Sequence, residues 1–415
     1  MSELVLSPAA IHLPGSPTIA ALNAVRNLTQ QGKKIINLGI GEMVPEIPTP
    51  DLIKTGMIEA IHADQYGYNP AEGCPELVSA LRDDLEENFG LHYELDQIAV
   101  CSGPKEAISK AMSVLLHHSL ERNEVITWAP IFESYTNVPS YFTGKPTIIL
   151  DTDEHLNPDL DQLERFLEEN NKRIAIATVN TPNNPTGQVY SEEVVRRMAS
   201  IFSRYPEIAI ISDEVYRFML HDDSVHHSIA KFIPNQTIIV SGISKEISGT
   251  GLRLGWLAAP KHVTQAVVNL GGNFTSCNQL PIQLAYANFL RADRDMTMRF
   301  SVRDKVGLRR SALLQAMHSL PGFSKLDFED PLGAFYMFPS VKRLMGHVMP
   351  DGRVIDSDVK VSTYLLEAAG VAVLPGSAFH KAGYIRMAYA CHSVERLVQA
   401  ATLMSKALCQ LKEAE

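Results

Sequence analysis

Five short segments carry side chains of the types that do chemistry, and each follows an apolar run. They begin at Ser102 (SGPKEA), Pro130 (PIFESY), Thr181 (TPNNPTG), Asp213 (DEVYR) and Gly242 (GISKEISGTGLRLG). Each has an ordinary structural explanation when taken singly. NNPTG suits a turn, Asp213 could cap a helix, and a lone lysine such as Lys245 is more often solvated than nucleophilic. Together, and in this order, the segments predict one shared site.

The apolar runs before these segments predict buried strands. They are short, rich in β-branched residues and almost uninterrupted, as strands covered on both faces should be, and they span 97–101, 124–128, 173–180, 207–212 and 237–241. Helix-like stretches lie between them, including 104–118, 191–205 and 262–270. The alternation predicts an α/β fold with a mainly parallel sheet wrapped by helices. Ligands bind such sheets at the carboxyl ends of the strands, where the polar segments should meet.

The two ends of the chain differ from its middle. Residues 1–45 look irregular, whereas after about residue 295 a charged helical segment, a short strand in GAFYMF, and helices from Ser357 and Ser393 are expected. We expect the ends to meet in a smaller α/β domain of residues 1–45 plus 296–415. The large domain would then span 46–295.

Composition excludes several classes of protein. Acidic residues outnumber basic ones by 47 to 37, which disfavours a nucleic-acid partner. The five cysteines are scattered and include no C-x-x-C pair, which argues against a disulfide framework or a zinc site and favours a reducing compartment. Neither a signal peptide nor a membrane-spanning apolar run is apparent, so we expect a cytoplasmic protein with no membrane or metal.

The segment from Ser241 to Gly255 resembles the cofactor-lysine signature of class I aminotransferases, which have fold type I and use pyridoxal 5'-phosphate. The similarity extends from NLGIGE, which begins at Asn37, to YIRMAYA, which ends at Ala390. Two positions depart from the family pattern. Gly249 stands where an apolar residue is usual, and Gly242 stands where many relatives have a serine that helps to hold the phosphate.

The resemblance implies how the ring of this cofactor would be bound. Lys245 would hold it as a Schiff base and then act as the base that moves the α-proton. Asp213 would keep the pyridine nitrogen protonated. Asn184 and Tyr216 would bind the ring hydroxyl, and Phe132 would cover one face of the ring.

The resemblance also implies a phosphate site. Gly103, Pro104 and Lys105 open a predicted helix whose N-terminus suits an anion, although Pro104 has no amide hydrogen to offer. Arg253 would clasp the phosphate through two hydrogen bonds. Tyr68 resembles a tyrosine that reaches the same phosphate from a partner subunit, which predicts a homodimer with shared active sites.

Arg386 matches the arginine that binds the substrate α-carboxylate, beside Gly41 and Asn184. In one subgroup of bacterial aspartate aminotransferases, the lysine at the position of Lys105 reads the distal carboxylate of aspartate or glutamate. A threonine in the N-terminal segment assists it there, and Thr18, or Ser16, would fill that place here. Alternatively, Lys105 neutralises the phosphate or lies in solvent.

The predicted function is a ping-pong transaminase that passes the amino group of an L-amino acid, most simply aspartate, to 2-oxoglutarate. Other donors remain open, namely methionine, alanine, an aromatic amino acid or prephenate, as does a β-lyase or oxidase reaction on the same machinery. A regulator that senses an amino acid would need a DNA-binding domain ahead of the fold, and only about 35 residues precede NLGIGE.

Overall fold

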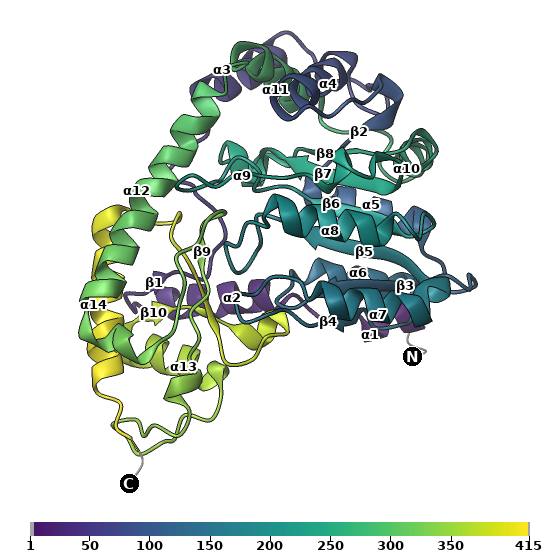
Figure 1. Cartoon of the computed structure of the whole chain (residues 1–415). Helices are drawn as coiled ribbons and strands as arrows, with labels where there is room; N and C mark the ends of the chain where they lie inside the picture. The colour runs from purple at the N-terminus through teal and green to yellow at the C-terminus, as the bar shows by residue number, and fades with distance from the viewer. Residues whose placement is uncertain (1–3, 414–415) are drawn as a thin grey trace.

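The computed structural model describes residues 4–413, apart from a few side chains in the two N-terminal helices. A seven-stranded sheet lies at its centre (Figure 1). The strand order is β2 (Ile98–Cys101), β8 (Gly255–Ala258), β7 (Thr237–Gly242), β6 (Ala209–Asp213), β5 (Ile174–Asn180), β3 (Glu124–Trp128) and β4 (Ile148–Leu150). The five strands from β7 to β4 are parallel, and β8 is antiparallel to both neighbours. The predicted α/β class with a mainly parallel sheet is confirmed.

Helices cover both faces of this sheet. One face packs against α5 (Pro104–Leu115), α6 (Ser134–Thr143) and α10 (Lys261–Phe274). The other packs against α7 (Leu160–Asn170) and α8 (Glu192–Phe202). Helix α8 begins after Ser191, whose hydroxyl accepts from the Val194 amide. Four of its buried residues, Val195, Met198, Ala199 and Phe202, have the i, i+3, i+4, i+7 spacing of one helix face, so an apolar stripe faces the sheet.

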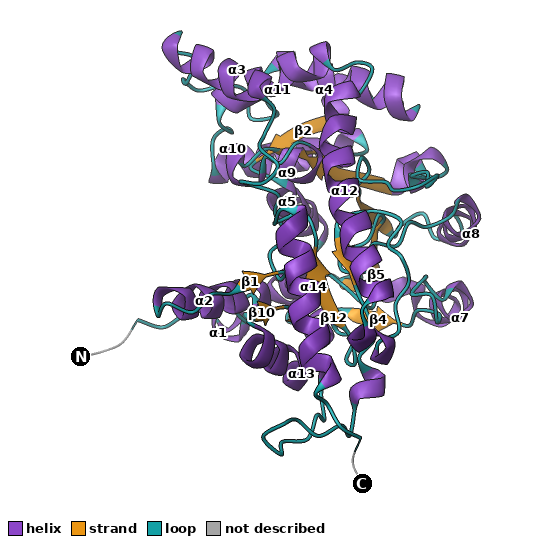
Figure 2. Cartoon of the chain, turned by 90° about the vertical axis from the view of Figure 1, so that its left-hand side faces the viewer, coloured by secondary structure: helices purple, strands orange, loops and turns teal. Residues whose placement is uncertain are grey.

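A separate layer of helices lies at the β2 edge of the sheet. It comprises α3 (Asp51–His62), α4 (Pro75–Phe89) and α11 (Leu280–Ala292), whose apolar residues share a core with β2 and β8. The long helix α12 (Thr297–Ser319) starts near this layer and runs down one side of the molecule to α14 (Val394–Cys409), as Figures 1 and 2 show.

Residues from both ends of the chain form a second set of short strands. Strand β1 (Ile36–Asn37) pairs in parallel with β10 (Val371–Ala372). Strands β11 (Leu374–Pro375), β12 (Ile385–Ala388) and β9 (Tyr336–Met337) form a three-stranded sheet, so only two residues of GAFYMF are strand. Helices α12, α13 (Asp358–Tyr364) and α14 share one core with them.

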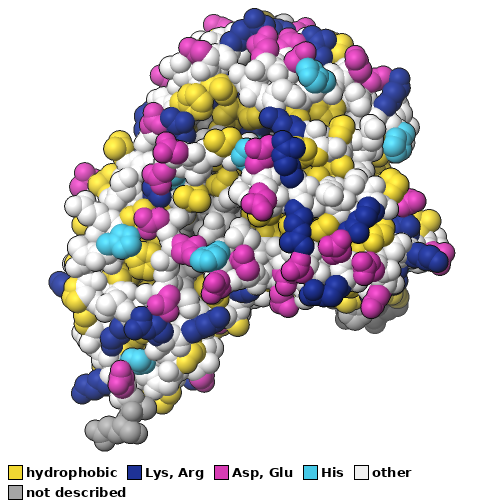
Figure 3. Space-filling model, in the orientation of Figure 1, with side chains coloured by type: hydrophobic (Ala, Val, Ile, Leu, Met, Phe, Trp, Pro, Cys, Tyr) yellow, Lys and Arg dark blue, Asp and Glu magenta, His cyan; other side chains and the backbone are white. Residues whose placement is uncertain are grey.

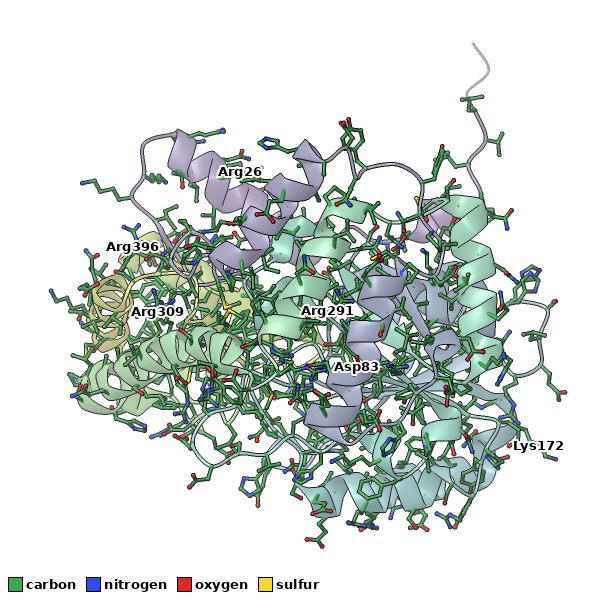
Figure 4. The ribbon with its side chains drawn as sticks, turned by 90° about the horizontal axis from the view of Figure 1, so that it is seen from above. Arg26, Asp83, Lys172, Arg291, Arg309 and Arg396 are labelled. Carbon is green, nitrogen blue, oxygen red and sulfur yellow. The ribbon has the colours of Figure 1, made fainter. Side chains whose placement is uncertain are left out.

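Hydrogen bonds join α12 and α14 to neighbouring segments. Arg309 of α12 donates to the carbonyl oxygen of His392 at 2.8 Å, and Arg396 of α14 donates to that of Ile35 at 3.3 Å. Seen from above, Arg309 and Arg396 lie on one side of the molecule and Lys172 lies on the opposite side (Figure 4). Basic and acidic side chains are interspersed over the face drawn in Figure 3.

The N-terminal segment is more regular than predicted. It forms α1 (Pro8–His12) and α2 (Pro17–Gln30), which begin after Ser7 and Ser16. Both serines cap their helix through the side chain, and both helices start with proline, a favoured first residue. The pairing of β1 with β10 supports the proposed smaller domain of 1–45 plus 296–415, although α1 packs against α6 beside the large sheet. The domain boundaries stay a prediction.

Candidate active site

A cavity of about 320 Å³ lies at the carboxyl ends of the parallel strands. Most of the residues predicted for the site line it: Gly41, Pro104, Lys105, Phe132, Asn184, Asp213, Tyr216, Lys245, Arg253 and Arg386. They come from segments that are distant in sequence; most lie at or just after the ends of strands of the large sheet, whereas Arg386 lies in the three-stranded sheet. Among residues 4–413, no group of three His, Cys, Asp or Glu side chains is arranged to hold a metal ion.

Lys245 lies in the short helix α9 (Ile243–Glu246) that directly follows β7. Its ammonium donates a hydrogen bond to the carbonyl oxygen of Gly41 and lies 5.4 Å from the centroid of the Phe335 ring. Burial and the positive charge of Arg386 lower the pKa of Lys245 to about 8. About a tenth of this amine is therefore unprotonated at pH 7, far more than for an ordinary lysine, and the unprotonated form is the one that acts as a nucleophile or a base.

Asp213 is the last residue of β6, and its carboxylate is buried at the cavity wall. Tyr135 donates its hydroxyl to Oδ2 at 2.6 Å, and the Val215 amide donates to Oδ1 at 3.3 Å. Burial raises the pKa of Asp213 to about 6, against the opposing effect of the Tyr135 hydrogen bond. Asp213 is therefore mostly ionised at neutral pH and can stabilise a buried cation. Tyr135 was missed in the sequence, although it ends the PIFESY segment one helical turn after Phe132.

Arg386 lies in β12, and 2% of it is exposed. Its guanidinium donates from Nη1 to the Asn184 side-chain oxygen at 2.9 Å and from Nη2 to the Gly39 carbonyl at 2.7 Å. Its Nε has no hydrogen-bond partner, and no carboxylate within residues 4–413 lies within 4 Å of it. A buried cation without a counter-ion is costly, so this guanidinium is suited to binding an anionic ligand.

The hydroxyl groups of Tyr216 and Tyr336 share a hydrogen bond of 2.8 Å. Burial raises the pKa of Tyr216 well above its usual range, so the phenol stays protonated and can donate. A side chain at Gly41 would meet the Tyr336 hydroxyl, which explains why glycine fits here. Tyr336 was also missed in the sequence, because nothing marks it within GAFYMF except its aromatic type.

The start of α5 forms the other end of the cavity with Arg253. Gly103 precedes the helix with φ of +99°, and a Cβ atom there would collide with the Arg253 guanidinium. Arg253 donates to the carbonyl oxygens of Thr250 at 2.9 Å and Ser102 at 3.0 Å. Because these partners are neutral, the charge of Arg253 can serve an anion at the helix N-terminus.

The two departures from the family signature have local packing reasons. A Cβ atom at Gly242 would lie 2.6 Å from the Gly255 Cα atom on the neighbouring strand β8. A Cβ atom at Gly249 would lie 2.7 Å from Cδ1 of Ile243, whose side chain fills that space. Larger side chains at either position would require the surrounding structure to shift.

Lys105 lies at the rim of the cavity, and 49% of its side chain is exposed. It forms an ion pair with Glu133, which also accepts hydrogen bonds from Ser16. Sequence reasoning did not assign Glu133 to the site. Thr18 lies in α2, and its side chain is outside the part of the chain that the structure describes.

Tyr68 is not brought into this cavity. It is 91% exposed and is not among the residues that line the cavity of its own chain. The hydroxyl of Tyr68 therefore does not serve the site of its own subunit, and its predicted role depends on a second chain.

The residues present fit pyridoxal phosphate. The cavity offers a partly buried amine of lowered pKa at Lys245, a buried carboxylate at Asp213, the Phe132 ring, and an anion site between Arg253 and the start of α5. These groups suit the aldehyde, ring nitrogen, ring face and phosphate of that cofactor respectively.

Comparisons with known proteins identify the family of this chain. The model of the family "Aminotransferase class I and II" matches residues 33–403. An aspartate aminotransferase of Rhizobium meliloti (strain 1021) is 31% identical over 372 residues, which cover 89% of this chain and 88% of that protein. A probable aspartate/prephenate aminotransferase of Aquifex aeolicus is 32% identical, with 96% and 97% covered.

Solved structures show the same fold. A crystal structure of the aspartate aminotransferase from Rhizobium meliloti matches with a TM-score of 0.90 and 28% identity, covering 99% of this chain and all of that chain. The aspartate aminotransferase of Thermus thermophilus with maleate matches with a TM-score of 0.87 and 28% identity, covering 98% and 100%. This chain therefore belongs to the aminotransferase class I and II family and is an enzyme of amino-group transfer.

Proposed function

We propose that the protein is a pyridoxal-phosphate-dependent transaminase that moves the amino group of an L-amino acid to a 2-oxo acid by a ping-pong mechanism. Aspartate and 2-oxoglutarate are the leading pair, because the relatives that match over nearly the whole chain carry the name aspartate aminotransferase. The observation that carries the proposal is Arg386, a buried guanidinium that faces the same cavity as Lys245 and has no carboxylate partner among the described residues.

The residues of the chain would hold the cofactor at both ends. When bound, pyridoxal phosphate draws electrons away from the α-carbon of an amino acid. Lys245 would hold it covalently, and Asp213 would keep a proton on the ring nitrogen. Asn184 and Tyr216 would bind the ring hydroxyl, and Phe132 would cover the ring face.

The phosphate would lie between Arg253 and the start of α5, where Gly103 leaves room for the Arg253 guanidinium. Arg253 can donate two parallel hydrogen bonds to phosphate oxygens, and the dipole of α5 favours negative charge at its N-terminus.

Substrate binding and proton transfer would be divided between two basic residues. Arg386 would bind the α-carboxylate and so orient the amino acid, which favours α-amino and α-keto acids over simple amines. Lys245, once released from the cofactor, would remove the proton from the α-carbon through Nζ and return it in the next step. The lowered pKa of Lys245, about 8, makes both roles possible near neutral pH.

We further propose that the active enzyme is a homodimer in which Tyr68 of each chain completes the phosphate site of the other. Its high exposure in the single chain supports this arrangement, because a large aromatic side chain is available for a partner.

A reducing compartment such as the cytoplasm would suit the five cysteines, all of which are free thiols. No helix within residues 4–413 is long and apolar enough to cross a membrane.

A panel of amino donors with 2-oxoglutarate tests the proposed reaction. We expect aspartate to give oxaloacetate and the reverse reaction to proceed with glutamate. If methionine, alanine or phenylalanine turned over rapidly while aspartate did not react, that amino acid and not aspartate would be the donor. Release of ammonia without a second amino acid product would indicate a lyase or an oxidase instead.

Borohydride reduction tests the covalent link to the cofactor. The folded protein should be incubated with pyridoxal phosphate, reduced and digested, and the peptides analysed by mass spectrometry. We expect the adduct on the peptide that contains Lys245. An adduct found only on exposed lysines would contradict the proposed chemistry.

A further inference from the structure

Glu133 is a partly buried carboxylate in the wall of the catalytic cavity. It directly precedes α6, and 10% of its side chain is exposed. The Lys105 ammonium donates to Oε1 at 3.0 Å, and the Ser16 hydroxyl lies 2.7 Å from each carboxylate oxygen. Ser16, Lys105 and Glu133 all line the cavity, so the ion pair faces the space that a substrate would enter.

The other cations of the cavity already have tasks. Among the cavity-lining residues that the structure describes, the cations are Lys105, Lys245, Arg253 and Arg386. Under the proposed function, Lys245 and Arg253 serve the cofactor, and Arg386 serves the α-carboxylate. Lys105 is therefore the cation left for a carboxylate on the substrate side chain.

A second carboxylate at Lys105 would have to compete with Glu133. The ammonium could share its three donors between both carboxylates, but the two negative charges would then lie close together in a partly buried site, where like charges repel. Alternatively, Lys105 could leave Glu133, which would then keep Ser16 as its remaining partner. Either outcome weakens the binding of a dicarboxylate. An uncharged side chain meets an intact ion pair and avoids this competition.

We propose that Glu133 is a specificity-determining residue: by occupying Lys105 it lowers the preference of the site for dicarboxylic substrates and makes donors with uncharged side chains better substrates by comparison. This inference rests on the proposed function, because it assumes that amino acids occupy the cavity. It concerns the relative rates of two substrate classes and leaves the transamination chemistry unchanged.

The test compares the holoenzyme with Glu133→Gln, which removes the charge but keeps the size and the ability to accept from Ser16. We expect the ratio of kcat/KM for aspartate to kcat/KM for alanine to rise about tenfold or more, as expected for removal of one nearby like charge. In a Lys105→Met background, the same substitution should raise the ratio less, because it relieves the repulsion by Glu133 but frees no cation for the substrate carboxylate. A ratio that stays constant or falls in Glu133→Gln would overturn the proposal, as would an equal rise in both backgrounds.

The chain offers a control ion pair outside the cavity, at the start of the strand that precedes Glu133, although its carboxylate also pairs with Arg173. Glu124, the first residue of β3, pairs with Lys145 at 3.0 Å, with side-chain exposures of 11% and 44% that nearly equal those of Glu133 and Lys105. Neither residue lines the cavity. Glu124→Gln should therefore leave the aspartate-to-alanine ratio unchanged, and a tenfold rise there would point to a nonspecific charge effect.

Ligand binding separates the failure of this inference from that of the proposed function. Dissociation constants for succinate and for butyrate, its monocarboxylic counterpart, are measured by calorimetry on the wild-type and Glu133→Gln holoenzymes. We expect succinate to bind about tenfold more tightly to the variant and butyrate to bind equally to both. If no amino acid transfers its amino group to 2-oxoglutarate, the proposed function fails, and the succinate measurement still decides the role of Glu133. Equal succinate affinity in both proteins would show that Glu133 does not determine specificity.

Discussion

The floor and the rim of the cavity hold the same kinds of side chain in different surroundings. At the floor, Lys245 and Asp213 are enclosed by protein, and burial moves the pKa of the amine down to about 8 and that of the carboxylate up to about 6. At the rim, Lys105 and Glu133 neutralise each other, and half of the lysine side chain is in solvent. Burial prepares a lysine to react, whereas pairing and exposure leave a lysine that can only recognise charge. The floor should therefore determine the reaction and the rim the choice of substrate.

The largest expected effect is that of Lys245→Ala. Turnover with aspartate should fall at least about 10⁴-fold, because the variant loses both the covalent link and the base. The measurement is kcat under saturating substrate. Lys105→Ala is the matched control from the rim and should retain much of the activity with an uncharged donor. If the two variants lost activity equally, the two lysines would not have the different roles assigned to them here.

Asp213→Asn should lower turnover about 10³-fold, because an amide cannot keep a proton on the ring nitrogen of the cofactor. The measurement is again kcat, with the absorbance of the bound cofactor as a check on occupancy. The variant should still bind pyridoxal phosphate through Lys245 and Arg253. A loss smaller than tenfold at full occupancy would show that the buried carboxylate is not needed for the chemistry.

Arg386→Lys should reduce kcat/KM for amino acids about 100-fold, because an ammonium cannot replace the two parallel hydrogen bonds of a guanidinium. The loss should be similar for aspartate and alanine, since both carry the same α-carboxylate. This uniform loss distinguishes Arg386 from Lys105, whose replacement should affect aspartate selectively. If Arg386→Lys reduced kcat/KM for aspartate much more than for alanine, Arg386 would instead bind the side chain of the substrate.

A further effect is on stability rather than on turnover, and it depends on pH. Since the pKa of Asp213 in the folded protein, about 6, exceeds the ordinary aspartate pKa of 3.8, the unfolded chain releases this proton at lower pH. The free energy of unfolding of the cofactor-free protein should therefore decrease as the pH rises from about 4 to about 6, because ionisation of Asp213 is less favourable in the folded state. Asp213→Asn should remove the penalty and stabilise the cofactor-free protein by up to about 3 kcal/mol at pH 7.5.

Urea unfolding of the two cofactor-free proteins at several pH values measures this difference. The gain should shrink toward zero near pH 4, where the wild-type carboxyl is protonated in both states. A variant that is less stable than the wild type at pH 7.5 would indicate that the hydrogen bond from Tyr135 outweighs the cost of burying the charge.

The sequence predicted the parts of the molecule that depend on local pattern. Strands β2, β3, β5, β6 and β7 were predicted from their apolar runs. Asp213 ends β6, and Lys245 lies just after β7. Strand β8 was missed because GWLA contains no β-branched residue, and β4 because it has only three residues. Helix α2 was missed, although Ser16 and Pro17 form a recognisable helix start.

The rest required the tertiary structure, because the partners lie far apart along the chain. The amino-acid sequence by itself determined the α/β architecture, the family and the order of the reactive groups on the strand ends, since these follow from periodicity and motif. Only the fold decided that Tyr135 supports Asp213 across 78 residues and that Ser16 meets Glu133 across 117. Such contacts arise when packing closes long loops, and no local pattern encodes which side chains will then meet.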